Sequence, residues 1–335
     1  MDRWRSKSSL TRRQFLEGMS AAAIAATAAC RRAPYRSSDF HLPDRSPVAL
    51  LPAASYQVDL GDVIYRGLSL LGTQVKGLRV FLKPNLVEYE AATVINTNAL
   101  VIAGAAAAFL RSGAREVIVG EGPGHRRDIE YLLLSTGVYD HLKDARLRFV
   151  DLNHDDVRRV PLRSHFTGAD EISLPVELLE SDFIVSMPKL KTHHWAGMTA
   201  SMKNFFGCVP GAVYGWPKNL LHVYGIDNSI VDLVSTIKPS LTIVDAVIAM
   251  EGDGPIMGRP RPMGFLAMGS DVVAVDSTCA RIIGFDPGKL PYLAASSRFL
   301  GNAAESLIDQ RGEPLRRYAT RFDVIDSMRE RQLGA

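Results

Sequence analysis

The sequence predicts an α/β fold of two lobes, built on largely parallel sheets with helices on both faces. Two observations lead to this prediction. Short β-branched and apolar runs alternate with longer amphipathic stretches from Val48 onward, and this alternation is typical of βαβ units. Polar, glycine-rich sequences follow several of the apolar runs, and open parallel sheets bind their ligands at the carboxyl ends of such strands.

Apolar runs bounded by polar or turn-forming residues give the expected strands: Val48–Leu51, Arg79–Leu82, Glu116–Val119, Arg148–Asp151, Phe183–Ser186, Leu241–Val244 and Phe265–Met268. Stretches with helical periodicity give the expected helices: Leu60–Leu71, Asn98–Ser112, Asp128–Ser135, Ser229–Ile237, Val272–Ile283 and Ala303–Gln310. These elements are expected to form one domain over residues 47–335, with lobes at about 47–180 and 181–335.

Residues 1–30 have the pattern of a twin-arginine signal peptide. The pair Arg12-Arg13 precedes twelve small or apolar residues, Gly18–Ala29, and resembles the twin-arginine export motif. Twelve helical residues span about 18 Å, too short for a bilayer core of about 30 Å, so a signal is preferred to a membrane anchor. A plain amphipathic helix is the alternative. The expected location is periplasmic or on the outer face of the cytoplasmic membrane, and the twin-arginine translocation machinery is an expected partner.

Cys30 follows two alanines and is a candidate lipid acceptor, with signal-peptidase cleavage nearby as the alternative. Residues 31–46 are polar and contain prolines, which predicts a tether. Cys208 and Cys279 are the only later cysteines, and they lack the close spacing of cluster ligands. We therefore expect no iron–sulfur cluster ligated by this chain alone.

The overall charge of +3 comes from the N-terminus. Residues 1–29 hold five of the 39 basic and two of the 36 acidic residues, which leaves 34 of each in the rest of the chain. A mature chain near neutrality gives no reason to expect nucleic acid as a partner. Membrane contact is expected only through a lipid at Cys30.

Four of the expected strands are followed by sequences that contain candidate ligand-binding or catalytic residues. These sequences are Lys83-Pro84-Asn85, Gly120–His125, Met187–Gly211 and Asp245. Because the carboxyl ends of parallel strands meet at one edge of a sheet, the four sequences are expected to form a common site.

The segment Met187–Gly211 contains three lysines and two histidines but no acidic residue. Such a cluster repels itself unless an anion or a metal lies among its members. A solvated basic loop is the alternative, and Lys203 has its own alternative as a counter-charge to a helix dipole. Lys203 and Asn204 are expected on the flank of a helix over Gly197–Phe206. The candidates for ligand contact in this segment are Lys189, Lys191, His193, Lys203 and Asn204.

Three further groups complete the predicted site. Lys83 and Asn85 stand at the end of their strand, where they would meet an anion. Gly122 and Gly124 belong to a Gly-Glu-Gly-Pro-Gly-His run whose backbone N–H groups can bind an anion; a plain βα turn explains the run equally well. His222 has apolar neighbours, which favours a core histidine over a ligand.

The chain resembles the family called domain of unknown function 362, which has no assigned reaction. The resembling sequences are FLKPN at Phe81–Asn85, DFIVSMPKLK at Asp182–Lys191, MKNFFGCVPG at Met202–Gly211, DAVIAMEGDG at Asp245–Gly254 and GSDVVAVD at Gly269–Asp276. Many relatives carry an added ferredoxin-like domain, which this chain lacks.

More distantly, the chain is similar to the nickel-pincer-nucleotide lactate racemase family. The similarity lies in Gly124-His125-Arg126, in His193-His194-Trp195-Ala196-Gly197 and in Lys203 ten residues after His193. It implies that His125 and His193 exchange the substrate's proton or hydride, that Lys203 holds the cofactor, and that His222 ligates nickel. The family's Asp-x-Thr-Arg motif is replaced by Lys83-Pro84-Asn85, which departs from its nucleotide site.

The leading hypothesis is an exported enzyme that binds an anionic cofactor or substrate and uses His125 and His193 as an acid–base pair. Racemisation, epimerisation or hydride chemistry on a hydroxy acid is its sharpest form, with a nickel-pincer-type nucleotide or a divalent metal as the implied cofactor. The alternative is a non-catalytic periplasmic protein that binds a small anionic ligand or assists a redox partner.

Overall fold

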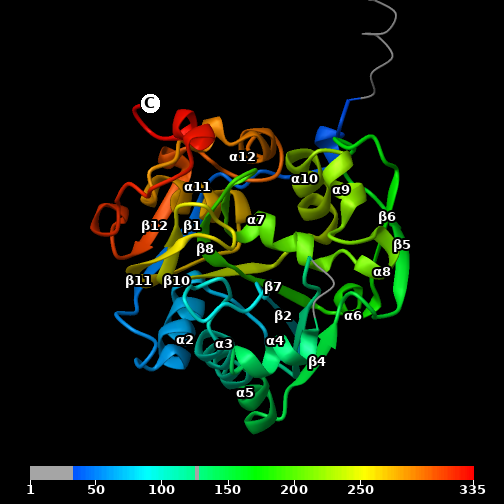
Figure 1. Ribbon diagram of the computed structural model, residues 1–335, viewed down its shortest axis with the longest axis vertical. Coiled ribbons are helices and arrows are strands. Elements are labelled where there is room, and N and C mark those ends of the chain that lie inside the picture. Colours follow the sequence, from blue (N-terminus) through cyan, green and yellow to red (C-terminus); the bar gives the residue numbers. More distant parts are fainter. Residues whose placement is uncertain (1–32, 125–127) are drawn as a thin grey trace, which may run out of the picture. The chain divides into compact units, whose positions relative to one another are not determined.

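The computed structural model describes residues 33–124 and 128–335. The predicted signal peptide with Cys30, and the candidate catalytic residue His125, lie outside these ranges. Residues Tyr35–Ala335 form one compact unit, shown in Figure 1. No described helix is both long and apolar enough to span a bilayer.

A ten-stranded sheet runs through this unit in the order β12-β1-β11-β10-β7-β2-β3-β4, with β8 paired to β10 and to β9. Its strands are β1 (Ser46–Pro52), β2 (Arg79–Pro84), β3 (Glu116–Glu121), β4 (Arg148–Asp151), β7 (Phe183–Met187), β8 (Lys189–His193), β9 (Gly197–Thr199), β10 (Leu241–Glu251), β11 (Arg259–Gly269) and β12 (Ile308–Gly312).

The neighbours from β10 to β4 all pair in parallel, and β12 is parallel to β1. Only β11 and the short β9 run antiparallel to their partners. The predicted α/β class and mostly parallel sheet are therefore confirmed. The two predicted lobes share this sheet, because β2 from the first pairs with β7 from the second.

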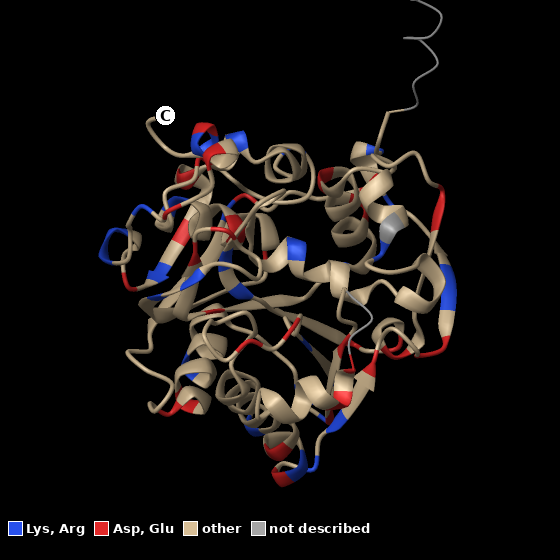
Figure 2. Cartoon of the chain, viewed as in Figure 1, with Lys and Arg blue, Asp and Glu red and all other residues tan. Residues whose placement is uncertain are grey.

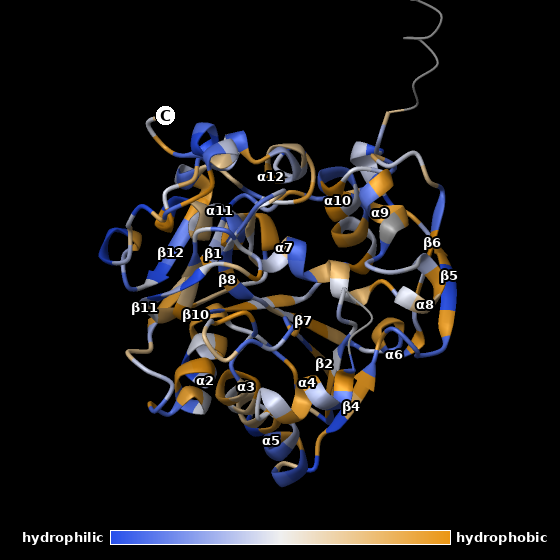
Figure 3. Ribbon diagram, viewed as in Figure 1, coloured by the Kyte–Doolittle hydropathy of each residue, from blue (hydrophilic) through white to orange (hydrophobic). Residues whose placement is uncertain are grey.

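Helices cover both faces of the sheet, as Figure 1 shows. One face carries α2 (Leu60–Leu71), α3 (Ala99–Arg111), α4 (Ile129–Ser135) and α5 (Val138–Asp144), and the other carries α7 (Ser201–Asn204), α10 (Ile226–Ile237), α11 (Val272–Ile282) and α12 (Pro291–Ser296). Strand residues alternate between the two apolar clusters: Val80 and Leu82 lie in one and Phe81 in the other. The central strands are correspondingly apolar in Figure 3.

The remaining elements are short. A separate hairpin pairs β5 (Val157–Pro161) with β6 (Glu171–Pro175). The minor helices are α6 (Val176–Leu179), α8 (Gly211–Tyr214) and α9 (Asn219–Val223), and the 3-10 turns are Ser37–Asp39, Phe205–Cys208, Pro287–Lys289, Glu305–Leu307, Leu315–Arg317 and Asp326–Arg331.

Two predicted helices are wrong. The expected helix Ala303–Gln310 is a 3-10 turn followed by β12, because this segment pairs with the open edge of β1 and satisfies its backbone groups. The expected helix Gly197–Phe206 is helical only from Ser201. Its first three residues form β9, since Gly197 has a φ of 85° and turns the chain back onto β8.

The segment predicted to be a polar tether is packed from Tyr35 onward. The Tyr35 ring stacks on Phe299 with ring centroids 4.0 Å apart, and Phe40 meets the same ring edge-on at 4.6 Å. Aromatic residues spaced through a polar stretch anchor it, because each buries a large apolar area. The segment is therefore part of the compact unit and does not behave as a tether.

Candidate anion-binding site

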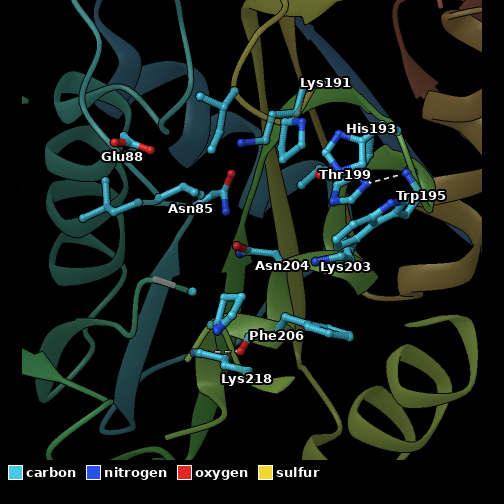
Figure 4. A pocket seen from close by; sticks show the side chains of 18 of the residues that line it. Asn85, Glu88, Lys191, His193, Trp195, Thr199, Lys203, Asn204, Phe206 and Lys218 are labelled. Atoms are coloured by element: carbon cyan, nitrogen blue, oxygen red, sulfur yellow. Dashed lines mark hydrogen bonds between the residues drawn. The ribbon is translucent and has the colours of Figure 1, made fainter. Parts of the chain in front are cut away.

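A cavity of about 610 Å³ opens where β2, β3 and β8 end. It brings together most of the predicted site residues, which Figure 4 shows in part. The predicted residues that line it are Asn85, Gly122, Gly124, Lys191, His193, Lys203, Asn204 and His222. Lys83 and Lys189 are not among its lining residues.

The local sequence explains how the histidine and lysine side chains reach this cavity. Pro188 ends β7, and the chain continues as β8 alongside β10, where the Asp245 N–H donates to the Pro188 carbonyl at 2.8 Å. After β8 the turn through Trp195 leads into β9 and then α7. Figure 2 shows basic positions on β8 and α7 at the centre of the fold, whereas most other charged residues lie on outer helices and loops.

Glu121, which lines the cavity, forms a fully buried ion pair with Lys83, with Nζ and Oε2 2.7 Å apart. The Glu121 carboxylate also accepts hydrogen bonds from the N–H groups of Leu86 and Gly122, both at 2.8 Å. Asn204 accepts from Lys83 Nζ at 3.3 Å and donates to the Lys83 carbonyl at 2.9 Å. Lys83 is thus neutralised within the fold, and Asn204 links α7 to β2.

Lys189 likewise has an internal counter-ion. Its Nζ lies 2.6 Å from Asp245 Oδ2 and donates to the Tyr56 hydroxyl at 2.7 Å. Burial and the nearby Asp245 carboxylate raise the pKa of Tyr56, which keeps its hydroxyl protonated. The positive charge of Lys189 is therefore compensated inside the fold. Its side chain is not available to the ligand anion that the sequence predicted it to bind.

Three cavity lysines have no such counter-ion. Lys191 Nζ donates to the Ile95 carbonyl at 2.8 Å, and Lys203 Nζ lies 4.0 Å from the centre of the Phe206 ring. Lys218 Nζ donates to the carbonyls of Gly122 and Phe206 at 2.8 and 3.0 Å. Within the described ranges, no carboxylate forms an ion pair with any of these three ammonium groups.

The pKa values of all three lysines are lowered, chiefly by burial. Burial, and then the Lys83 ammonium, lower the pKa of Lys203 to about 8. Burial lowers the pKa of Lys218 to about 7 against the opposing effect of Glu121. Burial and the neighbouring Lys203 hold the pKa of Lys191 well below its usual range. A bound anion would favour the charged form of all three.

Sequence reasoning missed Lys218 and Glu121. Lys218 follows Trp216-Pro217 with a φ of 69°, and its 1% exposure could not be read from a polar loop. Glu121 did carry a signal, since it is the only acidic residue in the run Gly120–His125 and directly follows a buried strand.

Two of the histidines that line the cavity, His193 and His222, have opposite tautomers. His193 Nδ1 faces the backbone N–H groups of Trp195 and Ala196, at 3.1 and 3.3 Å. It must accept from them, so the proton of the neutral ring lies on Nε2. His222 Nδ1 lies 3.2 Å from the Lys218 carbonyl, which can only accept. The lone pair of the neutral His222 ring is therefore on Nε2.

The protonation of His193 is fixed by its surroundings. Burial, and then the positive charges of Lys203 and Lys191, hold the pKa of His193 well below 6.5. The neutral ring therefore presents an Nε2–H donor at neutral pH, whereas His222 presents an acceptor nitrogen. Trp195 lies between them, with ring centroids 6.4 Å from His193 and 5.4 Å from His222.

The His222 tautomer is also the one that metal-binding histidines adopt, with Nδ1–H on a backbone carbonyl. No cluster of three or more His, Cys, Asp or Glu side chains suited to a metal ion occurs in the part of the chain that the structure describes. His222 as a nickel or other metal ligand stays a prediction, as does Lys203 as a point of cofactor attachment.

Comparison with known proteins gives a family match over most of the sheet. Residues 80–281 match the family described as a domain of unknown function, DUF362. The thylakoid-associated protein sll1697 of Synechocystis sp. is 29% identical over 270 residues, which is 75% of this chain and 78% of that protein.

Two solved structures are also similar. The lactate racemase apoprotein of Thermoanaerobacterium thermosaccharolyticum aligns with a TM-score of 0.42 and 13% identity, over 73% of this chain and 59% of the racemase. A Thermotoga maritima protein aligns with a TM-score of 0.38 and 15% identity, over 66% of this chain and 57% of that protein. The chain thus spans less than two thirds of either solved protein.

Proposed function

The chain belongs to the DUF362 family, and we propose that it is an enzyme that binds a small organic anion in the lysine-lined cavity. The observation that carries this proposal is the cluster of Lys191, Lys203 and Lys218, two buried lysines and one half-buried lysine that form no ion pair with a described carboxylate. Buried charge without a partner is costly in a folded protein. A carboxylate or phosphate group of a ligand supplies the missing charge.

The two lysines that have internal counter-ions support the same conclusion, because they differ from the cavity lysines. Lys83 and Lys189 are as deeply buried as Lys191, yet each has a carboxylate within 2.7 Å. The fold therefore provides internal counter-ions where it needs buried lysines for structure. The cavity lysines differ because their counter-ion comes from outside the chain.

The histidines favour an enzyme over a simple binding protein. His193 offers a proton donor and His222 a proton acceptor on the walls of one cavity, and such a pair can give and take a proton at a substrate held by the lysines. We infer racemase- or epimerase-like acid–base chemistry, or hydride chemistry, on a hydroxy acid. For hydride chemistry, a nickel-pincer-type nucleotide held by Lys203 and His222 would supply the hydride acceptor.

The anion site is tested by removing one lysine. Lys203→Met should lower the affinity for sulfate by about 10- to 100-fold, because a hydrogen bond between charged groups contributes about 1.5–3 kcal/mol. Isothermal titration calorimetry measures this change. Lys143→Met, on an exposed position of α5, is the matched control and should bind as the native protein does. Equal affinity in both variants would contradict the proposal.

The affinity should also depend on pH. Burial lowers the pKa of Lys218 to about 7 and that of Lys203 to about 8, and the anion binds their protonated forms. Binding therefore takes up protons, and sulfate affinity should fall as the pH rises from about 6.5 to 9.5, by at most about tenfold per unit for each proton taken up. Titrations in buffers of different ionisation enthalpy count these protons. A pH-independent affinity would be incompatible with lysines as the ligands.

We further propose export by the twin-arginine route, supported by Arg12-Arg13 and the following apolar run. Replacing both arginines with lysine should retain the full-length precursor in the cytoplasm of a host that has this system. Fractionation and intact mass test this. Cys30→Ser should leave export unchanged and release the protein from membranes where Cys30 carries a lipid. Export of the double variant at the native level would remove this part of the proposal.

A further inference from the structure

The most deeply buried lysines lie at the inner end of the cavity. Lys191 and Lys218 are at most 1% exposed, whereas Trp195 and Met257, which line the same cavity, are 56% and 79% exposed. A carboxylate fills only a small part of about 610 Å³. The ligand therefore has a larger part that extends outward from its anionic group.

The walls along that outward path are mainly apolar. The lining includes the apolar residues Val87, Phe206, Ile256 and Met257, together with the carboxylates Glu88 and Asp253. Trp195 stands at the mouth with its ring edge-on to those of His194 and His222, at 4.7 and 5.4 Å. Large apolar side chains that stay exposed beside a cavity mark a binding surface, since their burial by a ligand is favourable.

The mouth also carries a negative charge. Asp253 lines the cavity, and its side chain is 54% exposed. Its nearest basic neighbour is His194 Nδ1, at 3.5 Å, which is charged only when protonated. A second carboxylate on the ligand would approach Asp253 and be repelled.

We propose that the ligand is a monoanion with an apolar body, such as a medium-chain or aromatic carboxylic acid. Its anionic group lies among the inner lysines, and its apolar part lies across Trp195 and Met257. This inference rests on the anion-binding function proposed above and adds the ligand's second feature. It predicts that dicarboxylates of the same chain length bind only weakly.

Calorimetric titrations with butyrate, hexanoate and adipate test this inference directly. Hexanoate should bind about 5- to 15-fold more tightly than butyrate, because each buried methylene group contributes about fourfold in affinity. Adipate has the same chain length with a second carboxylate and should bind at least about fivefold more weakly than hexanoate.

Two variants at the mouth of the cavity test which side chains cause the preference for the longer acid. Trp195→Ser and Met257→Ser should each reduce the preference for hexanoate over butyrate to about threefold or less, while sulfate affinity stays unchanged. Both side chains are largely exposed, so the variants should keep the native melting temperature. Val157→Ser, at an exposed position of β5, is the control.

The outcomes separate the two proposals. If sulfate and all three acids bind with equal affinity, or if both variants at the mouth keep the native preference, the apolar-body inference is wrong and the anion site stands. If neither sulfate nor any of the acids binds, the anion site is wrong and this inference falls with it.

Discussion

Replacing Asp245 with alanine is expected to lower the free energy of unfolding by about 3–5 kcal/mol, because it leaves a buried ammonium group without its counter-ion. Lys189 is 1% exposed and lies 2.6 Å from Asp245 Oδ2. Its other partners, the Tyr56 hydroxyl and the Ile248 carbonyl, carry no formal charge. Asp245 also accepts from the N–H of Asn98, the residue that caps α3, at 2.9 Å.

Urea denaturation measures this loss, and two further variants show its cause. Asp309→Ala removes the partly exposed partner of Arg311 and should cost less than about 1 kcal/mol. In the double variant Lys189→Met with Asp245→Leu, both charges are gone, and most of the lost stability should return. If Asp245→Ala costs no more than Asp309→Ala, the buried pair does not stabilise the fold as argued.

The sheet could be predicted because its strands are encoded locally. The predicted strands Arg79–Leu82 and Glu116–Val119 lie within β2 and β3, since strands buried on both faces appear as continuous apolar runs. β12 could not be predicted in this way. Its residues have no strand pattern of their own, and they become a strand only because β1 offers an unpaired edge.

That these residues would line one cavity could be predicted for a similar reason. Polar, glycine-rich sequences after parallel strands meet at one edge of the sheet, and they bring residues as distant as Asn85 and His222 to one cavity. This inference needs only the order of the elements. It does not need the partner of any single side chain.

Which lysines have an internal carboxylate partner and which have none could not be predicted. Lys83 and Lys189 looked like Lys191 in the sequence, but their counter-ions Glu121 and Asp245 lie 38 and 56 residues away. Only the fold shows which charges are compensated. The histidine tautomers could not be predicted from the sequence either, because they depend on backbone groups of Trp195, Ala196 and Lys218.

The acid–base role is expected to produce the second large effect. His222→Asn should lower turnover of a chiral 2-hydroxy acid by about 100-fold or more, the usual contribution of a general base. Asparagine can still donate to the Lys218 carbonyl in place of Nδ1, but it has no basic nitrogen. His193→Asn should act similarly, since its amide oxygen can still accept from the Trp195 N–H but its shorter side chain no longer places a donor at the position of Nε2.

The measurement uses protein purified from a host with its export system intact, so that a bound cofactor is retained. L-Lactate and L-2-hydroxyhexanoate are the probes, and chiral chromatography follows their loss of optical purity. Sulfate binding by both variants should stay within about threefold of the native value, because the lysines remain. A non-catalytic binding protein predicts a different pattern: native protein and variants would bind sulfate equally well, and none of them would change either probe.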